Sequence, residues 1–173
     1  TKPPSPEVLR ARDDFKDFCV YMGKAPAHHM LEWHTELCTG EDSECLLGVG
    51  GPNTAILAPR GSAKSTVLGL FAAWMIGRHT AAKQMLRILY IAYMVDISRA
   101  KSATIKGILT SNKYREIFPM VRLSKIKRSD EYWSIDYDFA GIDTAGEEAF
   151  TIACGGLKGA ITSKRSQLVL IDD

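Results

Sequence analysis

Apolar residues recur along the chain with two different spacings, and the spacing changes near residue 54. Before that point they repeat every three to four residues, which predicts an amphipathic helix over 6–22 and a short helix over 30–37. Ser5 is suited to cap the first helix, and Pro6 suits its first turn. Residues 39–53 are rich in turn-forming residues and are expected to form a connector.

After residue 54 the apolar runs are shorter, and strand patterns alternate with helix patterns. The predicted elements are a strand at 54–57, a helix at 64–77 ending at Gly77, a strand at 87–93, a helix at about 96–110 capped by Asp96, and strands at 132–136, 149–153 and 167–171. The last run, QLVLI, is typical of a parallel strand that is covered on both faces. This order predicts an α/β fold with a mainly parallel sheet flanked by helices.

The composition is that of one globular domain, with 173 residues of which 46% are hydrophobic and 24% charged. We expect an N-terminal helical segment over 1–45 and an α/β core over 46–173. The longest apolar runs reach about half of the roughly 20 residues needed to span a membrane, so no membrane span is expected. Because the chain stops inside an expected core strand, we expect it to be part of a longer protein. Its histidines and cysteines match no usual zinc-site spacing.

Charge is unevenly distributed, although the net charge is only +2. Residues 101–130 carry eight basic side chains and two acidic ones, whereas residues 131–150 carry six acidic side chains and no basic one. Such segregation has two interpretations, a surface that binds nucleic acid and a solvated helix face beside an acidic loop. We expect the stretch from Lys101 to Arg128 to face DNA or a neighbouring subunit.

Residues 58–66, with the sequence APRGSAKST, connect the first predicted strand to the apolar helix. Binding of a nucleotide phosphate requires a tight loop of backbone N–H groups, a lysine at the helix start and a hydroxyl one residue later for Mg²⁺. Lys64 and Ser65 meet the last two requirements. The usual pattern has glycine at positions 58 and 63, where this chain has alanine, and Gly61 is expected to supply the permissive backbone. The alternative is a simple helix cap formed by Ser62 or Ser65.

The apolar strand at the end of the chain delivers Asp172 and Asp173 at its carboxyl end, where ligands bind in open α/β sheets. The first carboxylate is placed to hold Mg²⁺ and the second to orient or deprotonate the attacking water. Together with residues 58–66, this pair predicts a nucleotide-hydrolysing site.

With these residues, the chain resembles the ATPase domain of the large terminase subunits of tailed bacteriophages, the motors that package DNA into proheads. The motif Ala-Pro-Arg-Gly-x-Ala-Lys-Ser-Thr, with its arginine at position 60, is similar to the phosphate loop of many of these motors. Gly156-Leu157-Lys158-Gly159, followed by Lys164-Arg165 before the acid-ended strand, also fits. Upstream, Pro26 and His29 resemble the segment that lies near the adenine. The resemblance spans residues 26–173 and implies a P-loop NTPase fold that is cut after the acid-ended strand.

The resemblance also implies roles for individual residues, with ATP and Mg²⁺ as cofactors. Lys64 would contact the β- and γ-phosphates, Ser65 and Asp172 would ligate Mg²⁺, and Asp173 would be the catalytic carboxylate unless a glutamate beyond the end of the chain takes that role. Arg60 would contact or sense the γ-phosphate, or instead pair with an acid at the rim of the loop. The expected nucleotide-binding residues are Pro59, Arg60, Gly61, Ser62, Ala63, Lys64, Ser65 and Thr66.

A protein of this family would be an ATPase coupled to translocation of double-stranded DNA, in the cytoplasm of the infected bacterium. Its partners would be the portal protein, the small terminase subunit and further copies of itself in a ring, and any nuclease activity would lie beyond this chain. Two alternatives stay open. One is another nucleic-acid-stimulated P-loop ATPase of the helicase type, and the other is a non-catalytic module that binds nucleotide or DNA.

Overall fold

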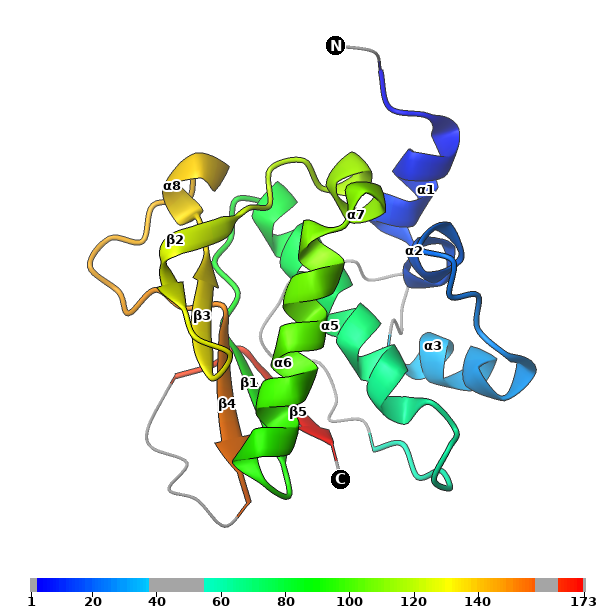
Figure 1. Cartoon of the computed structure of the whole chain (residues 1–173). Helices are drawn as coiled ribbons and strands as arrows, with labels where there is room; N and C mark the ends of the chain where they lie inside the picture. Colours follow the sequence, from blue (N-terminus) through cyan, green and yellow to red (C-terminus); the bar gives the residue numbers. More distant parts are fainter. Residues whose placement is uncertain (1–2, 38–54, 158–164, 173) are drawn as a thin grey trace.

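The computed structural model describes residues 3–37, 55–157 and 165–172 of the chain. These residues form an open α/β structure with a five-stranded mixed sheet in the order β2-β3-β4-β1-β5 (Figure 1). The strands are β1 (Ile88–Ala92), β2 (Leu123–Arg128), β3 (Tyr132–Ile135), β4 (Ile152–Gly156) and β5 (Leu168–Asp172). The predicted α/β class is confirmed.

Parallel and antiparallel pairing divide the sheet into two halves. β1 pairs in parallel with β4 on one side and β5 on the other. β3 pairs antiparallel with both β2 and β4. The prediction of a mainly parallel sheet is therefore only half right, because the polar edge strand β2 was not predicted and the apolar pattern at 132–136 did not reveal the direction of β3.

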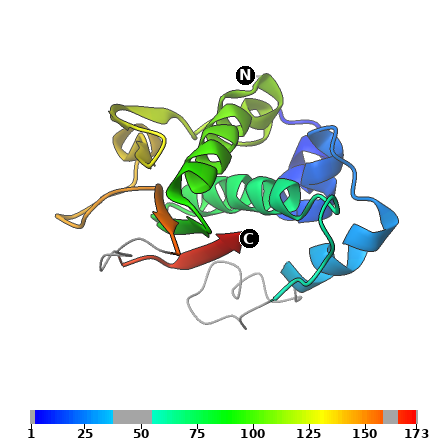
Figure 2. The same ribbon diagram turned by 60° about the horizontal axis from the view of Figure 1, so that its bottom comes forward.

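Two long helices, α5 (Lys64–Ala81) and α6 (Val95–Thr110), lie together on one side of the sheet (Figure 2). The short helices α1 (Pro6–Asp13) and α2 (Phe15–Tyr21) pack against α5. Phe15 and Phe18 of α2 belong to the same hydrophobic core as Trp74 of α5 and Ile88 of β1. The N-terminal helical residues and the sheet thus share one core, while the predicted division at residue 45 stays a prediction.

The predicted helix over 6–22 is two helices, because a second cap lies inside it. Ser5 caps α1 as predicted, with its Oγ accepting from the Val8 N–H at 3.3 Å. Asp14 adopts extended backbone angles and its Oδ1 accepts from the Asp17 N–H at 2.8 Å, which starts α2. An Asx cap of this kind competes with helix continuation, so the apolar periodicity runs through a break. The second predicted helix is confirmed as η1 (His28–Met30) followed by α3 (Leu31–Leu37).

Helix α5 continues past Gly77, which was predicted to end it. A Cβ at Gly77 would lie 2.3 Å from Cδ2 of Phe118, so the absent side chain makes room for that ring. Gly77 therefore serves packing rather than termination. α6 begins at Val95 with Met94 as its N-cap, which places Asp96 in the first turn instead of at the cap.

The predicted strand at 54–57 is not formed by the part that the structure describes. Residues 55–57 have no regular structure, and the Leu57 side chain is 96% exposed. The prediction that β5 is covered on both faces is also wrong for the described chain, since Leu170 and Asp172 are buried while Val169 and Ile171 are exposed. The predicted connector at 39–53 lies outside the described residues.

The sequence analysis missed three elements, α7 (Asn112–Ile117), β2 and α8 (Tyr137–Ala140). Ser111 caps α7 by accepting from the Tyr114 N–H, and Asp136 caps α8 by accepting from the Phe139 N–H.

None of the helices in the described parts of the chain is long and apolar enough to cross a membrane.

Candidate phosphate and metal site

Residues 58–63 form a loop that leads into the N-terminus of α5 with two left-handed backbone positions. Gly61 has φ of 81°, and Ala63, the N-cap residue, has φ of 64° and ψ of 24°. The expectation that Gly61 supplies a permissive backbone position is confirmed. Ala63 occupies a conformation that costs an L-residue roughly 1–2 kcal/mol, at the position where the usual phosphate-loop pattern has glycine.

Side chains of the loop hold its own backbone. Ser62 Oγ donates to the Pro59 carbonyl at 2.7 Å, and Lys64 Nζ donates to the Ala58 carbonyl at 2.9 Å. The N-cap position of α5 is Ala63, which has no side-chain acceptor. The hydroxyls of Ser62 and Ser65 donate to the Pro59 carbonyl and to Asp172, so among the described residues neither serine is the cap of α5. The N–H groups of the first turn of an α-helix have no acceptor within the helix, and they attract anions.

Strand β5 brings its last described carboxylate to this helix end. The alternation along β5 directs Leu170 into the core and Asp172 to the same face, where Asp172 is 5% exposed. Ser65 Oγ donates to Asp172 Oδ1 at 2.9 Å. Two of the predicted metal ligands, far apart in the sequence, therefore meet as predicted.

The spacing of these two oxygens fits Mg²⁺. Neighbouring ligands of an octahedral Mg²⁺ with bonds of about 2.0–2.1 Å lie about 3 Å apart. The Ser65 Oγ to Asp172 Oδ1 distance is 2.9 Å. A Mg²⁺ site in proteins commonly uses one or two protein oxygens and completes its shell with water and phosphate. Within residues 3–37, 55–157 and 165–172 no group of three or more histidine, cysteine or acidic residues could hold a metal.

Tyr90 is a member of this cluster that the sequence analysis did not identify. Its hydroxyl donates to Asp172 Oδ2 at 3.1 Å, so the two carboxylate oxygens have different partners. Parallel pairing sets Ala92 opposite Asp172 and places Tyr90, two residues earlier, on the same face. Burial, followed by the negative charge of Asp172, raises the pKa of Tyr90, which therefore keeps its proton and remains a donor. No signal in the sequence revealed this contact, because it depends on the register between strands.

His29, which the resemblance places near the adenine, lies next to the loop in the structure. Its Nε2 is 3.4 Å from the Ser62 carbonyl oxygen, and its ring packs edge-on against Trp33 at 5.5 Å between centroids. Pro26, from the same segment, is half-buried. The contact with a base stays a prediction.

The other predicted site residues are less well defined. Pro59, Arg60 and Thr66 are exposed. None of the ion pairs between described residues involves Arg60, so the alternative of an acid partner at the loop rim finds no support there. Asp173, the predicted catalytic carboxylate, lies outside the described residues, as do Lys158, Gly159 and Lys164 of the upstream motif.

The chain has no significant match among protein-family models, curated proteins or solved structures.

Proposed function

We propose that this chain is an ATPase domain of the P-loop class, which binds Mg²⁺-ATP between the loop at 58–66 and the end of β5. The hydrogen bond of 2.9 Å between Ser65 and Asp172 carries the proposal. It joins a hydroxyl at the start of a helix to a buried carboxylate at the carboxyl end of a parallel strand. A phosphate-binding helix end and a metal-binding strand end are the two parts that nucleotide hydrolysis requires.

The chain's own residues divide the work of binding. The N–H groups at the start of α5 donate to phosphate oxygens, and Lys64 exchanges its bond to the Ala58 carbonyl for one to a phosphate. Ser65 and Asp172 hold Mg²⁺, while Tyr90 fixes the second oxygen of Asp172. When bound, Mg²⁺ neutralises charge on the β- and γ-phosphates. Arg60, exposed on the loop, contacts the γ-phosphate, and Asp173 or a later glutamate orients the attacking water.

The biological setting that we propose follows from the terminase-like form of the loop, above all Arg60 with alanine at positions 58 and 63. ATP hydrolysis would drive double-stranded DNA into a prohead in the cytoplasm of an infected bacterium. The partners would be portal protein, small terminase subunit and further copies of this chain in a ring. A helicase-type ATPase would use the same phosphate and metal site, so DNA translocation requires a separate test.

Binding of ATP to the chain, with and without Mg²⁺, tests the nucleotide site. We expect Lys64→Ala to weaken Mg²⁺-ATP binding by about 10- to 100-fold, the range for loss of a hydrogen bond to a charged group. Asp172→Asn should remove the Mg²⁺ dependence but spare the affinity measured without metal. Lys113→Ala, which removes an exposed lysine on α7, is the matched control and should bind as the parent does.

Two results would separate the alternatives. Equal affinity of the parent and Lys64→Ala would contradict the phosphate site altogether. Mg²⁺-ATP binding without turnover, even in a longer protein that contains this chain, would favour the non-catalytic module.

A further inference from the structure

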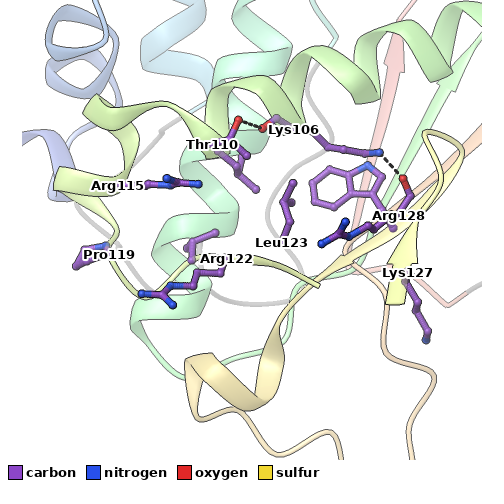
Figure 3. Close-up of a pocket in the computed structure, with 11 residues that line it drawn as sticks. Lys106, Thr110, Arg115, Pro119, Arg122, Leu123, Lys127 and Arg128 are labelled. Carbon is purple, nitrogen blue, oxygen red and sulfur yellow. Dashed lines mark hydrogen bonds between the residues drawn. The ribbon is translucent and has the colours of Figure 1, made fainter. Parts of the chain in front are cut away.

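A second polar region lies at the opposite edge of the sheet from Asp172. A pocket of about 770 Å³ opens between α6, α7 and β2, and its lining includes Leu109, Val121, Leu123 and Trp133 as apolar walls (Figure 3). The strand order places β2 and β5 at the two edges of the sheet. Four strand spacings of about 4.8 Å separate them by about 19 Å. The pocket is therefore distinct from the phosphate and metal site.

The polar side chains of this pocket are almost all cationic. Five of its lining residues are basic and none is acidic: Lys106, Arg115, Arg122, Lys127 and Arg128. Lys106 is neutralised, because its Nζ donates to Asp130 Oδ1 at 2.6 Å and to the Arg128 carbonyl at 2.8 Å. Lys127 Nζ donates to the Ala149 carbonyl at 2.6 Å and lies 5.6 Å from the Tyr132 ring centroid, and no described carboxylate forms an ion pair with it.

The three arginines retain most of their hydrogen-bonding capacity. A guanidinium group has five N–H donors. Arg128 uses one of them, since its Nε donates to the Ser124 carbonyl at 3.0 Å. Arg122 lies over the Phe139 ring, 3.8 Å from its centroid, which leaves its edge available. Among the described residues none of the three has a carboxylate at ion-pair distance. Figure 3 shows Arg115 and Arg128 on opposite sides of Leu123, with Arg122 below them.

We propose that this pocket is an anion site whose Arg115, Arg122 and Arg128 bind the phosphate groups of a ligand that carries several of them. Guanidinium groups bind phosphate oxygens in a bidentate manner, and a phosphate offers more acceptor oxygens than a carboxylate. Because Arg115, Arg122 and Arg128 are exposed, they attract an anion through their summed charge in contact with solvent, and salt should weaken the binding. A volume of about 770 Å³ lies within the usual range of small-ligand pockets, about 300–1,000 Å³.

Two carriers could present these phosphate groups, a soluble phosphate ester and the backbone of a nucleic acid. Both would meet the same three arginines, but only a backbone would extend beyond the pocket to exposed Lys125 on β2. The site does not depend on the proposed ATPase activity. It refines the expectation that residues 101–128 face DNA, since it identifies which of these cations are available.

The test measures binding of tripolyphosphate and of a short DNA duplex, both in a Lys64→Ala background that weakens the other phosphate site. Replacing Arg115, Arg122 and Arg128 together with glutamine should weaken binding of the ligand by at least about tenfold. Arg115→Gln alone, on an exposed side chain without a hydrogen bond to another described residue, should weaken it by about threefold without affecting the fold. Lys125→Gln removes a charge from β2 outside the pocket and is the control for tripolyphosphate binding.

The pattern of results identifies the carrier. Loss of tripolyphosphate binding in the triple variant, with Lys125→Gln unchanged, supports a soluble ester. Loss of duplex binding, with a smaller salt dependence in the triple variant and a further small loss in Lys125→Gln, supports a nucleic-acid backbone. The proposal is overturned if neither ligand binds the Lys64→Ala protein, or if the triple and Arg115→Gln variants, folded by circular dichroism, bind both ligands as tightly as that protein does.

Discussion

The two edges of the sheet place polar groups under opposite conditions. At the β5 edge, Ser65, Tyr90 and Asp172 form a closed set in which each carboxylate oxygen has its own donor. At the β2 edge, Arg115 and Arg122 border a pocket without any acidic lining residue. The polar groups at the β5 edge are hydrogen-bonded to one another. The arginines at the β2 edge have no carboxylate partner among the described residues, so their charge is available to a ligand.

This difference determines how each region should respond to mutation. A buried, fully bonded cluster loses its geometry when one member is removed, because the remaining groups are left unpaired away from water. A group of exposed arginines acts through summed charge, so single changes have small effects that depend on salt. Single substitutions at the β5 edge should therefore have large effects on binding. Single substitutions at the β2 edge should have small effects that add up as more arginines are replaced.

Among substitutions that compare the two edges, the largest effect on Mg²⁺ affinity is expected at Tyr90. Tyr90→Phe removes the donor to Asp172 Oδ2 while keeping the ring in the core. Loss of a group that orients a metal ligand typically lowers metal affinity by about 10- to 100-fold. We expect the Mg²⁺ concentration needed for half-maximal ATP binding to rise by this factor, with little change in ATP affinity measured without metal.

Tyr132→Phe provides the control for this prediction. The Tyr132 hydroxyl also bonds a carboxylate, Glu148 at 2.9 Å, but at a site far from β5 in the strand order. It should leave the Mg²⁺ requirement unchanged. An equal Mg²⁺ requirement in Tyr90→Phe and the parent would show that Tyr90 only packs.

A smaller effect is expected from low pH, which should destabilise the helices α3 and α5 through their buried histidines. Burial lowers the pKa of both His34 and His79, and the Met75 carbonyl bonded to His79 Nδ1 only partly opposes this. The unfolded chain therefore binds more protons than the folded chain below about pH 6.5, and stability falls as the pH drops through that range. Melting temperatures at pH 7.5 and pH 5.5 measure this loss.

His34→Phe should reduce the acid sensitivity, because a phenyl ring retains the stacking on Phe15, observed at 4.6 Å between centroids, without a titrating group. His28→Asn, at an exposed position, should leave it unchanged. The same pH dependence in His34→Phe and the parent would assign the effect to other groups.

Elements with a clear apolar pattern could be predicted from the sequence. Features that depend on a contact with a residue distant in the sequence could not. The buried helix at α5 and the strands β1 and β5 were found from their apolar runs. Gly77 was misread as a helix end because its role is set by Phe118. β2 was missed because it is an edge strand with little alternation, in which Ile126 is 91% exposed.

The same distinction holds for the β5 site. Lys64, Ser65 and Asp172 could be proposed as site residues because phosphate and metal chemistry restrict both residue type and local context, and the structure brings Ser65 and Asp172 together. Tyr90 could not, because a tyrosine in an apolar strand is indistinguishable from a core residue until the register with β5 is known. Nor could the arginine pocket be identified, since charge along the sequence does not reveal which cations are already paired.

The smallest expected effect concerns the backbone of the loop itself. Ala63→Gly relieves a left-handed alanine, worth roughly 1–2 kcal/mol, but a glycine also gains about 0.4–1 kcal/mol of entropy in the unfolded chain. The net change should be a stabilisation between about zero and about 1.6 kcal/mol, measured by urea unfolding. Ala103→Gly, at an exposed right-handed position within α6, should instead destabilise by about 1 kcal/mol. Destabilisation of the same size in both variants would mean that the loop does not hold Ala63 in the left-handed conformation, and the β5 edge would then be less rigidly organised than its hydrogen bonds indicate.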